Sequence, residues 1–224
     1  MKRWISISFD GASVLIALAI ILIPVIARAE SEGRTYLDLD GKVYECHVQP
    51  LELELRPFVR TESRFREKGL VYQQWFGGVR LKLLPWLSLQ SFYSRQDLTY
   101  PDKPKAGQNL VVGDVVFHPR FGPFRLLNRE ENEWHITERF YRYRNMTEVL
   151  YTLPFQWLGL YAFDEFRIDS DQSRVNLNDV GGGFQFDPTR QLAIRLFYDR
   201  ESNRRLKPQW EQTDVLGLSF AVHL

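Results

Sequence analysis

Apolar and polar residues alternate along most of this chain, and a two-residue period indicates β-strands whose two faces meet different surroundings. The clearest stretch is 51–56, where leucines occupy the odd positions and charged residues the even ones. The same alternation recurs in 139–153, 192–199 and 216–224. After residue 30 no window shows the i, i+3, i+4, i+7 spacing of an amphipathic helix. The sequence therefore predicts an all-β chain.

Two kinds of break separate the alternating segments. Short breaks contain proline, which cannot donate to a strand ladder and favours tight turns, at 84–86, 119–123, 154–156 and 187–190. Longer polar breaks fall at 61–69, 97–108, 132–135, 169–174 and 201–209. The strands expected between them are 43–60, 70–84, 86–97, 108–118, 123–132, 136–153, 156–168, 174–187, 190–201 and 210–224. Short turns that alternate with longer loops predict an up-and-down meander of ten strands.

Composition excludes several functional classes. The 224 residues are 44% hydrophobic, which is too apolar for a disordered chain, and 29 Lys+Arg against 28 Asp+Glu give no basic excess for nucleic acid. A single cysteine excludes an internal disulfide framework and a cysteine-cluster zinc site. No apolar run after residue 30 approaches the roughly 18 residues of a membrane-spanning helix.

The first 29 residues have the pattern of a secretory signal peptide. Lys2 and Arg3 precede an apolar run at 14–25, and 27–29 (Ala-Arg-Ala) supplies the small residues read by a signal peptidase. Cleavage after Ala29 would leave 195 residues and predicts export; an uncleaved anchor helix is the alternative. Residues 30–42 are expected to form a periplasmic N-terminal segment, although the turn at Asp40-Gly41 could instead add two strands and make twelve.

Segment length and aromatic placement favour an outer-membrane β-barrel over a soluble one, with the barrel over 43–224. Most segments reach ten residues, as transmembrane strands require, and soluble strands are shorter. Aromatic residues cluster near strand ends, as in the girdles of membrane barrels: Trp75, Trp86, Tyr93, Trp134, Tyr151, Trp157, Tyr161 and Trp210. The final strand ends on apolar Leu224, where such barrels prefer phenylalanine. A soluble periplasmic barrel that binds a lipid or another ligand is the alternative.

Residues 125–224 resemble the uncharacterised outer-membrane β-barrels of Gram-negative bacteria that form a domain of unknown function. The motifs that carry the resemblance are Asn128-Arg129-Glu130-Glu131, 139–144 (Arg-Phe-Tyr-Arg-Tyr-Arg), Leu153-Pro154 with Asp164-Glu165-Phe166, Gly181-Gly182-Gly183-Phe184 and 215–220 (Val-Leu-Gly-Leu-Ser-Phe). The resemblance implies a fold and a compartment, the outer membrane. It implies no activity, because none is established for that family.

If the apolar parity faces lipid, the charged parity lines the lumen. That parity contains equal numbers of acidic and basic residues: Glu52, Glu54, Arg56, Arg60, Arg80, Lys82, Asp114, Glu138, Arg142, Arg144, Glu148, Glu165, Arg195 and Asp199. A narrow interior cannot hold these charges unpaired, because an uncompensated buried ion costs several kcal/mol. We therefore expect ion-pair networks between strands, for example of the charged residues in 138–148 with Glu165. The alternative is a narrow, charge-lined solute path.

The sequence offers no convincing catalytic, metal or cofactor site. His135 is the one plausible general base for a lipid-modifying enzyme, and no nucleophile motif accompanies it. Cys46 and His47 would point to opposite faces of a strand and cannot readily chelate one ion. Asp164-Glu165 and the loop at 169–171 suit calcium or simply solvent.

The predicted function is a non-catalytic outer-membrane barrel, acting as a structural or docking component or as a narrow solute path. Its expected partners are outer-membrane lipid and an envelope protein bound through the loops or through Cys46. No nucleic-acid partner and no cofactor are expected. The triplet at 181–183 lacks the strand-to-helix context of a phosphate loop, so we expect it to permit curvature or a close neighbour.

Overall fold

The computed structural model describes residues 32–48, 51–66, 69–99, 106–155, 157–171, 174–204 and 209–224. Within these ranges all regular structure is β-strand, as the alternation predicts. The strands are β1 (Glu32–Asp40), β2 (Tyr44–Val48), β3 (Leu51–Arg66), β4 (Gly69–Leu84), β5 (Leu87–Leu98), β6 (Ala106–Phe117), β7 (Arg120–Phe121), β8 (Phe124–His135), β9 (Phe140–Thr152), β10 (Leu158–Asp169), β11 (Arg174–Thr189), β12 (Leu192–Asn203) and β13 (Glu211–His223). The described residues include no helix that could cross a bilayer. The predicted signal peptide lies outside the described residues.

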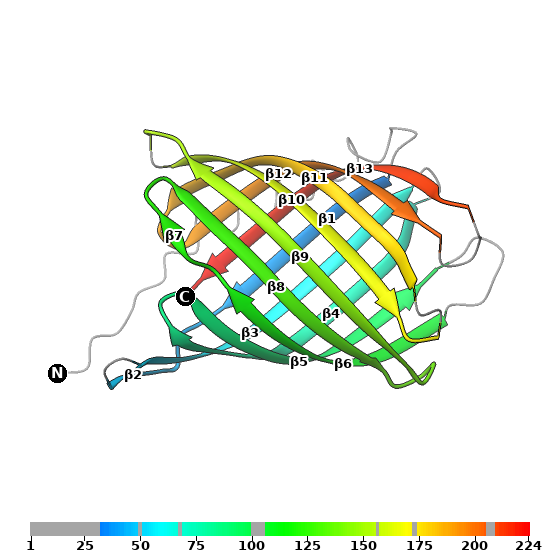
Figure 1. The fold of residues 1–224 in the computed structure, drawn as a ribbon, viewed down its shortest axis with the longest axis horizontal. Coiled ribbons are helices and arrows are strands. Elements are labelled where there is room, and N and C mark those ends of the chain that lie inside the picture. The colour runs from blue at the N-terminus through cyan, green and yellow to red at the C-terminus, as the bar shows by residue number, and fades with distance from the viewer. Residues whose placement is uncertain are drawn as a thin grey trace.

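Eleven of these strands close into a barrel (Figure 1). From β3 to β13 each barrel strand pairs antiparallel with its neighbour along the chain, and β1 then lies between β13 and β3. The two short strands lie outside this ring: β2 pairs with the start of β3, and β7 pairs with the start of β8. The proline-containing reversals lie at one end of the barrel, the turn end, and the longer connections lie at the other, the loop end (Figure 1).

The predicted number of ten strands is wrong, and so is the alternative of twelve. Residues 32–40, which we expected outside the barrel wall, form the eleventh strand. In an up-and-down meander with an odd number of strands, the first and last run in the same direction. Ring closure therefore pairs β1 parallel to β13, from Glu32 opposite Val215 to Asp40 opposite His223.

Several strands extend farther toward the loop end than the sequence predicted. The expected break at 61–69 is mostly strand, because β3 continues to Arg66 and β4 starts at Gly69. The expected break at 132–135 is also strand, and the reversal follows it, with Arg139 at a left-handed φ of 59°. At 61–64 and 131–133 polar residues occupy both the inward and the outward positions, so the composition there resembles that of a loop.

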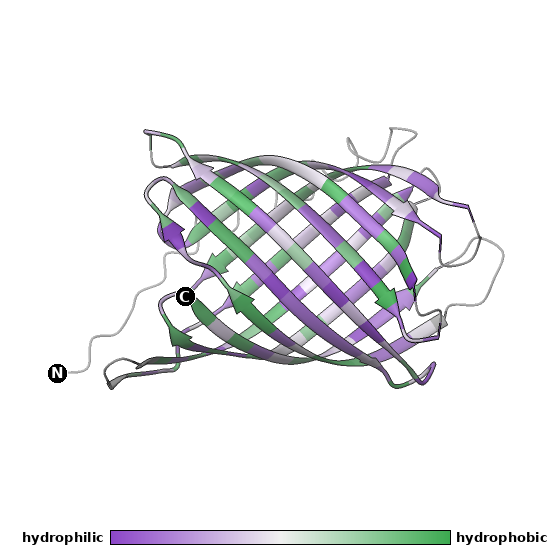
Figure 2. Ribbon diagram, in the orientation of Figure 1, coloured by the Kyte–Doolittle hydropathy of each residue, from purple (hydrophilic) through white to green (hydrophobic). Residues whose placement is uncertain are grey.

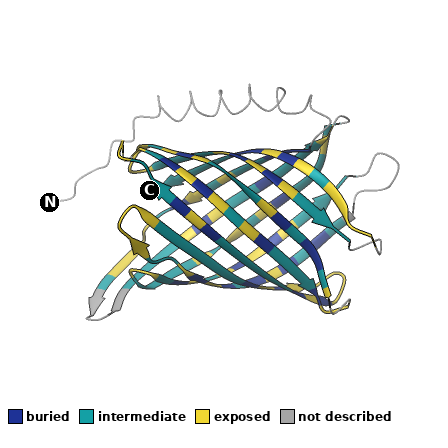
Figure 3. Cartoon of the chain, turned by 45° about the horizontal axis from the view of Figure 1, so that its top comes forward, coloured by how far each residue is buried: buried dark blue, intermediate teal, exposed yellow. Residues whose placement is uncertain are grey.

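The barrel is inside-out relative to a soluble protein. Carboxylates and guanidinium groups on the inner face are buried, whereas large apolar side chains on the outer face are exposed. Along β9, for example, Arg142 and Glu148 are buried while Tyr141 and Val149 are exposed. Figures 2 and 3 show this as two alternating patterns along the same strands, one of hydropathy and one of burial.

Glycines let neighbouring strands and rings approach closely. At Gly182 and Gly183 a Cβ atom would lie 2.5 Å from the Tyr161 carbonyl oxygen and 2.0 Å from the Leu196 carbonyl oxygen, respectively. The close neighbour expected for the 181–183 triplet is therefore present. On β13 a Cβ at Gly217 would lie 1.9 Å from the ring of Phe197, so this glycine makes room for an aromatic side chain inside the barrel.

Candidate functional site in the barrel lumen

The lumen is the candidate functional site because the charged residues converge there. Thirteen of the residues predicted to line it are described with their side chains; the side chain of Glu52 lies outside that set, as does that of His47. The structure distributes the described charges into separate ion-paired groups along the barrel.

The first group, the Arg34 cluster, joins β1, β3 and β12 near the loop end. It contains Glu32, Arg34, Glu62, Arg64, Arg66, Asp199 and Glu201. Arg34 donates to Glu201 at 2.9 Å and to Asp199 at 3.5 Å, and Arg64 donates to Glu62 at 2.7 Å. These side chains, apart from that of Arg66, are mostly buried, so each cation is shared among several carboxylates.

The sequence missed most of this cluster. Asp199 alone was among the residues predicted to line the lumen. The others lie on β1, in the predicted break after residue 60, or at the end of β12, where local polarity indicated a loop. The signal that could have found them is the continued alternation of charge at positions 60, 62, 64 and 66.

The second group, the Arg144 cluster, joins β8 to β11. It contains Arg129, Glu131, Glu133, Arg142, Arg144, Glu165, Arg167, Asp169 and Asp179. Arg144 contacts Glu165 at 2.8 Å and Glu131 at 2.7 Å. The structure thus brings Arg144 and Glu165 together, as we expected of this pair. Arg142 instead bonds Asp169, at 2.5 and 3.1 Å.

Two smaller groups lie nearer the turn end. Asp40 contacts Arg56 at 2.7 Å and Arg80 at 3.0 Å, and Arg56 also bonds Glu54. Glu148 forms a two-pronged pair with Arg195, with oxygen–nitrogen distances of 2.8 and 2.9 Å. This pair crosses from β9 to β12, with the Arg195 guanidinium 4.6 Å from the centroid of the Tyr161 ring.

Lumen residues are not all polar. One buried apolar cluster contains Phe58, Phe92, Leu110 and Val112, and Phe76 packs against it. A second contains Leu150, Tyr161, Phe197 and Val215, and Tyr36 and Phe163 pack against it. These clusters sit between the ion-paired groups and narrow the interior.

A cavity of about 800 Å³ runs inside the barrel. Its wall includes Glu138, Asp171 and Glu211, which are exposed at the loop end, so the cavity reaches that rim. Toward the turn end the wall extends to Glu148, Arg195 and the aromatic residues Phe76 and Phe92. Phe58, Ser88, Asp114 and Val116 are buried inside the barrel but do not line this cavity.

The remaining residues considered in the sequence analysis are His135, Glu138 and Cys46. His135 is fully buried on β8, where Nε2 lies 2.8 Å from a Glu133 oxygen and the ring stacks on Phe140. Glu138 lies in the turn before β9 and accepts a hydrogen bond from Gln108. Cys46 is a free, half-buried thiol on β2. Among the described residues no group of three or more His, Cys, Asp or Glu side chains is placed to hold a metal ion.

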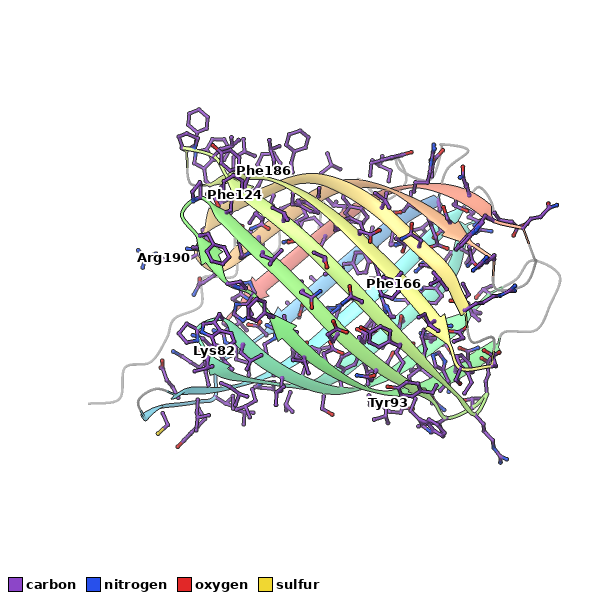
Figure 4. The ribbon with its side chains drawn as sticks, in the orientation of Figure 1. Lys82, Tyr93, Phe124, Phe166, Phe186 and Arg190 are labelled. Carbon is purple, nitrogen blue, oxygen red and sulfur yellow. The ribbon has the colours of Figure 1, made fainter. Side chains whose placement is uncertain are left out.

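The outer wall carries aromatic side chains at two levels. Phe124 and Phe186 lie near the turn end, and Tyr93 and Phe166 lie closer to the loop end (Figure 4). Between these levels the wall is mainly Val and Leu, for example Val115 on β6.

A polar seam interrupts this outer surface on β8 and β9, and its members bond one another. Asn128 donates to Thr147 at 3.0 Å, and Asn145 donates to Glu130 at 2.7 Å. Tyr143 also donates to Glu130. The polar groups of this seam are thus hydrogen-bonded within the wall.

Comparison with known protein families, with curated proteins and with solved structures finds no match for this chain. The resemblance to uncharacterised outer-membrane barrels therefore stays a prediction that rests on the motifs given above.

Proposed function

We propose that this chain is a non-catalytic β-barrel protein of the outer membrane, held in lipid by its outer wall. The observation that carries the proposal is the inverted side-chain distribution: ionised side chains inside, and exposed Val, Leu, Phe, Tyr and Trp outside. A soluble barrel with this outer wall would expose a large continuous apolar surface to water, which monomeric soluble proteins rarely do. In lipid the same surface is favourable, and ring closure leaves no edge strand among the eleven strands of the barrel.

The paired lumen favours a structural, docking or ligand-binding role over that of an open pore. Arg34, Arg64 and Arg144 each contact carboxylates on other strands, and these contacts brace the wall from within. Breaking one such buried pair costs roughly 3–5 kcal/mol. A solute would have to displace these side chains or pass them in a narrow space.

An envelope protein is the second partner we propose, in addition to lipid. The β2–β3 extension at the turn end lies outside the closed ring and carries Cys46, a half-buried thiol. With the turn end toward the periplasm, this extension is placed to contact a periplasmic partner.

The test is cell fractionation combined with heat-dependent gel mobility. Expressed with its leader, the protein should separate with outer membranes and require detergent for extraction. Because a closed barrel resists the detergent of the gel until heated, the unheated sample should migrate faster than the boiled one. Recovery in the periplasmic fraction without detergent, with one mobility, would favour the soluble ligand-binding barrel and refute this proposal.

A matched pair of variants on β6 adds residue-level resolution to that test. Both variants are at Val115, which faces outward and is exposed; the next residue, Val116, faces inward and is buried. If the outer wall meets lipid, Val115→Arg should reduce insertion, by about 2–4 kcal/mol near the bilayer midplane. Val115→Thr should insert normally. If Val115→Arg inserts as well as the parent, the outer wall does not face lipid.

A further inference from the structure

Three acceptor oxygens in the wall of the loop-end cavity receive no hydrogen bond from the part of the chain that the structure describes. They are Oδ1 of Asn176, Asp179 and Asp199. All three side chains line the cavity, and each residue is at most 3% exposed. A buried acceptor without a donor costs about 1–3 kcal/mol, and more when it carries charge. These oxygens are therefore poised to accept hydrogen bonds from a molecule in the cavity.

The two aspartates are also incompletely neutralised. Asp199 contacts Arg34 at 3.5 Å, but Arg34 lies closer, at 2.9 Å, to Glu201. Asp179 contacts Arg167 at 3.6 Å, but Arg167 lies closer, at 2.8 Å, to Glu165. Among its described members the Arg34 cluster holds four carboxylates and three guanidinium groups. This excess of one negative charge would attract a cation to the cluster.

The acceptors are spread along one seam of the wall. Gly181 on β11 pairs with Asp199 on β12, and Asp179 lies one inward position closer to the loop end. At about 3.3 Å per residue, the backbone of Asn176 lies at most about 10 Å beyond that of Asp179, because the register of β11 with β10 is irregular beside Leu177. On the other side of Asp179, Asp199 lies about 7 Å along the strands and one strand across. One compact ion cannot reach all three oxygens, whereas an extended molecule with several donor groups can.

The cavity wall beside this seam is aromatic and apolar. Tyr36, Tyr161, Phe163 and Phe197 line the cavity along with the aspartates. The Arg195 guanidinium lies over the face of one of these rings, that of Tyr161, and the faces of aromatic rings in general attract cations. Methylene segments between donor groups would pack on the same rings.

We propose that the loop-end cavity binds a linear aliphatic polyamine, with ammonium groups on Asp179 and Asp199 and a further N–H donor on Asn176. An ammonium group offers three donors and a positive charge, and methylene spacers keep the ammonium groups apart along the seam and suit the apolar wall. A metal ion fits less well, since the described side chains provide no ligand set for one. This inference does not depend on the membrane location, because the cavity is internal.

The experiment is titration calorimetry on the full chain, folded in non-ionic detergent so that no anionic lipid competes. Spermidine is the probe, Mg²⁺ tests for charge alone, and sucrose tests for neutral hydroxyl donors. We expect spermidine to bind with one molecule per barrel, and neither Mg²⁺ nor sucrose to displace it. Absence of spermidine binding, or full displacement by Mg²⁺ or sucrose, would overturn the polyamine assignment.

Substitutions of the two aspartates test whether spermidine binds at this seam. Asp179→Asn and Asp199→Asn should each weaken spermidine binding about tenfold or more, since each removes a charge-assisted hydrogen bond. Asp214→Asn is the matched control, because Asp214 lies on the neighbouring strand, faces outward and pairs with Arg200. Equal loss in all three variants, or no loss in the first two, would show that spermidine binds elsewhere.

A stability measurement separates this role from a purely structural one. Without spermidine, Asp179→Asn should fold, shown by heat-dependent mobility, and should unfold at an equal or higher urea concentration, because it removes an undercompensated buried charge. If Asp179 served to brace Arg167, the variant would be destabilised and the proposal would fail. Asn176→Leu removes the third acceptor without altering charge, and it should weaken spermidine binding less than either aspartate variant.

Discussion

The stability contributed by the Glu148–Arg195 pair reports how far water is excluded from the lumen at this level. The perturbation is Arg195→Met, with Glu148→Met and the double variant completing a thermodynamic cycle. The pair is suited to this because its two hydrogen bonds, at 2.8 and 2.9 Å, join one carboxylate to one guanidinium. No third charged residue among those described forms a salt bridge with either partner.

The expected magnitude follows from burial. Removal of Arg195 leaves the Glu148 carboxylate, whose side chain is 3% exposed, without its cation. An uncompensated buried charge costs roughly 3–5 kcal/mol. The Arg195 side chain itself is 26% exposed, toward the cavity, so water can replace part of the lost interaction. We therefore expect Arg195→Met to lower the free energy of unfolding by about 2–4 kcal/mol. The double variant should lose less than the sum of the singles, with a coupling of about 2 kcal/mol.

Urea unfolding of the refolded barrel, followed by tryptophan fluorescence, gives these free energies, since exposed tryptophans such as Trp134 report on the outer wall. The control is Arg200→Met on the same strand, where Arg200 pairs with Asp214 at 3.0 Å but both side chains are at least half exposed. That exposed pair should be worth less than about 1 kcal/mol. If Arg195→Met costs no more than Arg200→Met, the lumen is hydrated at this level and the reasoning from buried ion pairs is wrong.

Three further predictions concern the wall itself. Gly217→Ala should destabilise the barrel by about 1–3 kcal/mol in urea unfolding, because its methyl group would meet the Phe197 ring, whereas Gly113→Ala, with open space around it, should be nearly neutral. Arg139→Gly should stabilise by roughly 0.5–1 kcal/mol, since the left-handed φ of 59° strains a residue with a Cβ; a loss of stability would contradict this. Deletion of residues 32–40 should abolish the fast-migrating form on unheated gels, because β1 bridges β13 and β3, and retention of that form would show that the ring closes without it.

The alternation predicted the barrel strands well where one face is apolar and the other charged. The segment 192–199 is such a case, since β12 has Leu192, Leu196 and Tyr198 outward and Arg195 inward. Strand β1 was missed because Leu37 and Leu39 are its only large outward apolar residues. Its role depends on ring closure, which is set by strand pairs far apart in the sequence.

The partners within the lumen could be predicted only in kind. That enclosed charges neutralise one another follows from electrostatics alone. The pairing of Arg144 with Glu165 could also be predicted, because the two residues lie on adjacent strands of the meander. Glu148 was expected to join that network, yet it pairs with Arg195, three strands away. That contact depends on side-chain reach over the Tyr161 ring and on barrel curvature, and neither is encoded in local alternation.

Glu148 and Arg195 also lie where the cavity wall ends toward the turn end, and this position links the ion pair to solute passage. Phe76 and Phe92 also line the cavity, and buried Phe58 packs in the same apolar cluster. If the paired lumen blocks passage, the parent protein should be silent in planar bilayers. The Glu148→Ala, Arg195→Ala double variant removes both long side chains without leaving a net charge, so it should conduct small ions if this pair is the barrier. A parent protein that conducts steadily would mean that the charged wall is a solute path, and the structural and ligand-binding roles would then have to be abandoned in favour of transport.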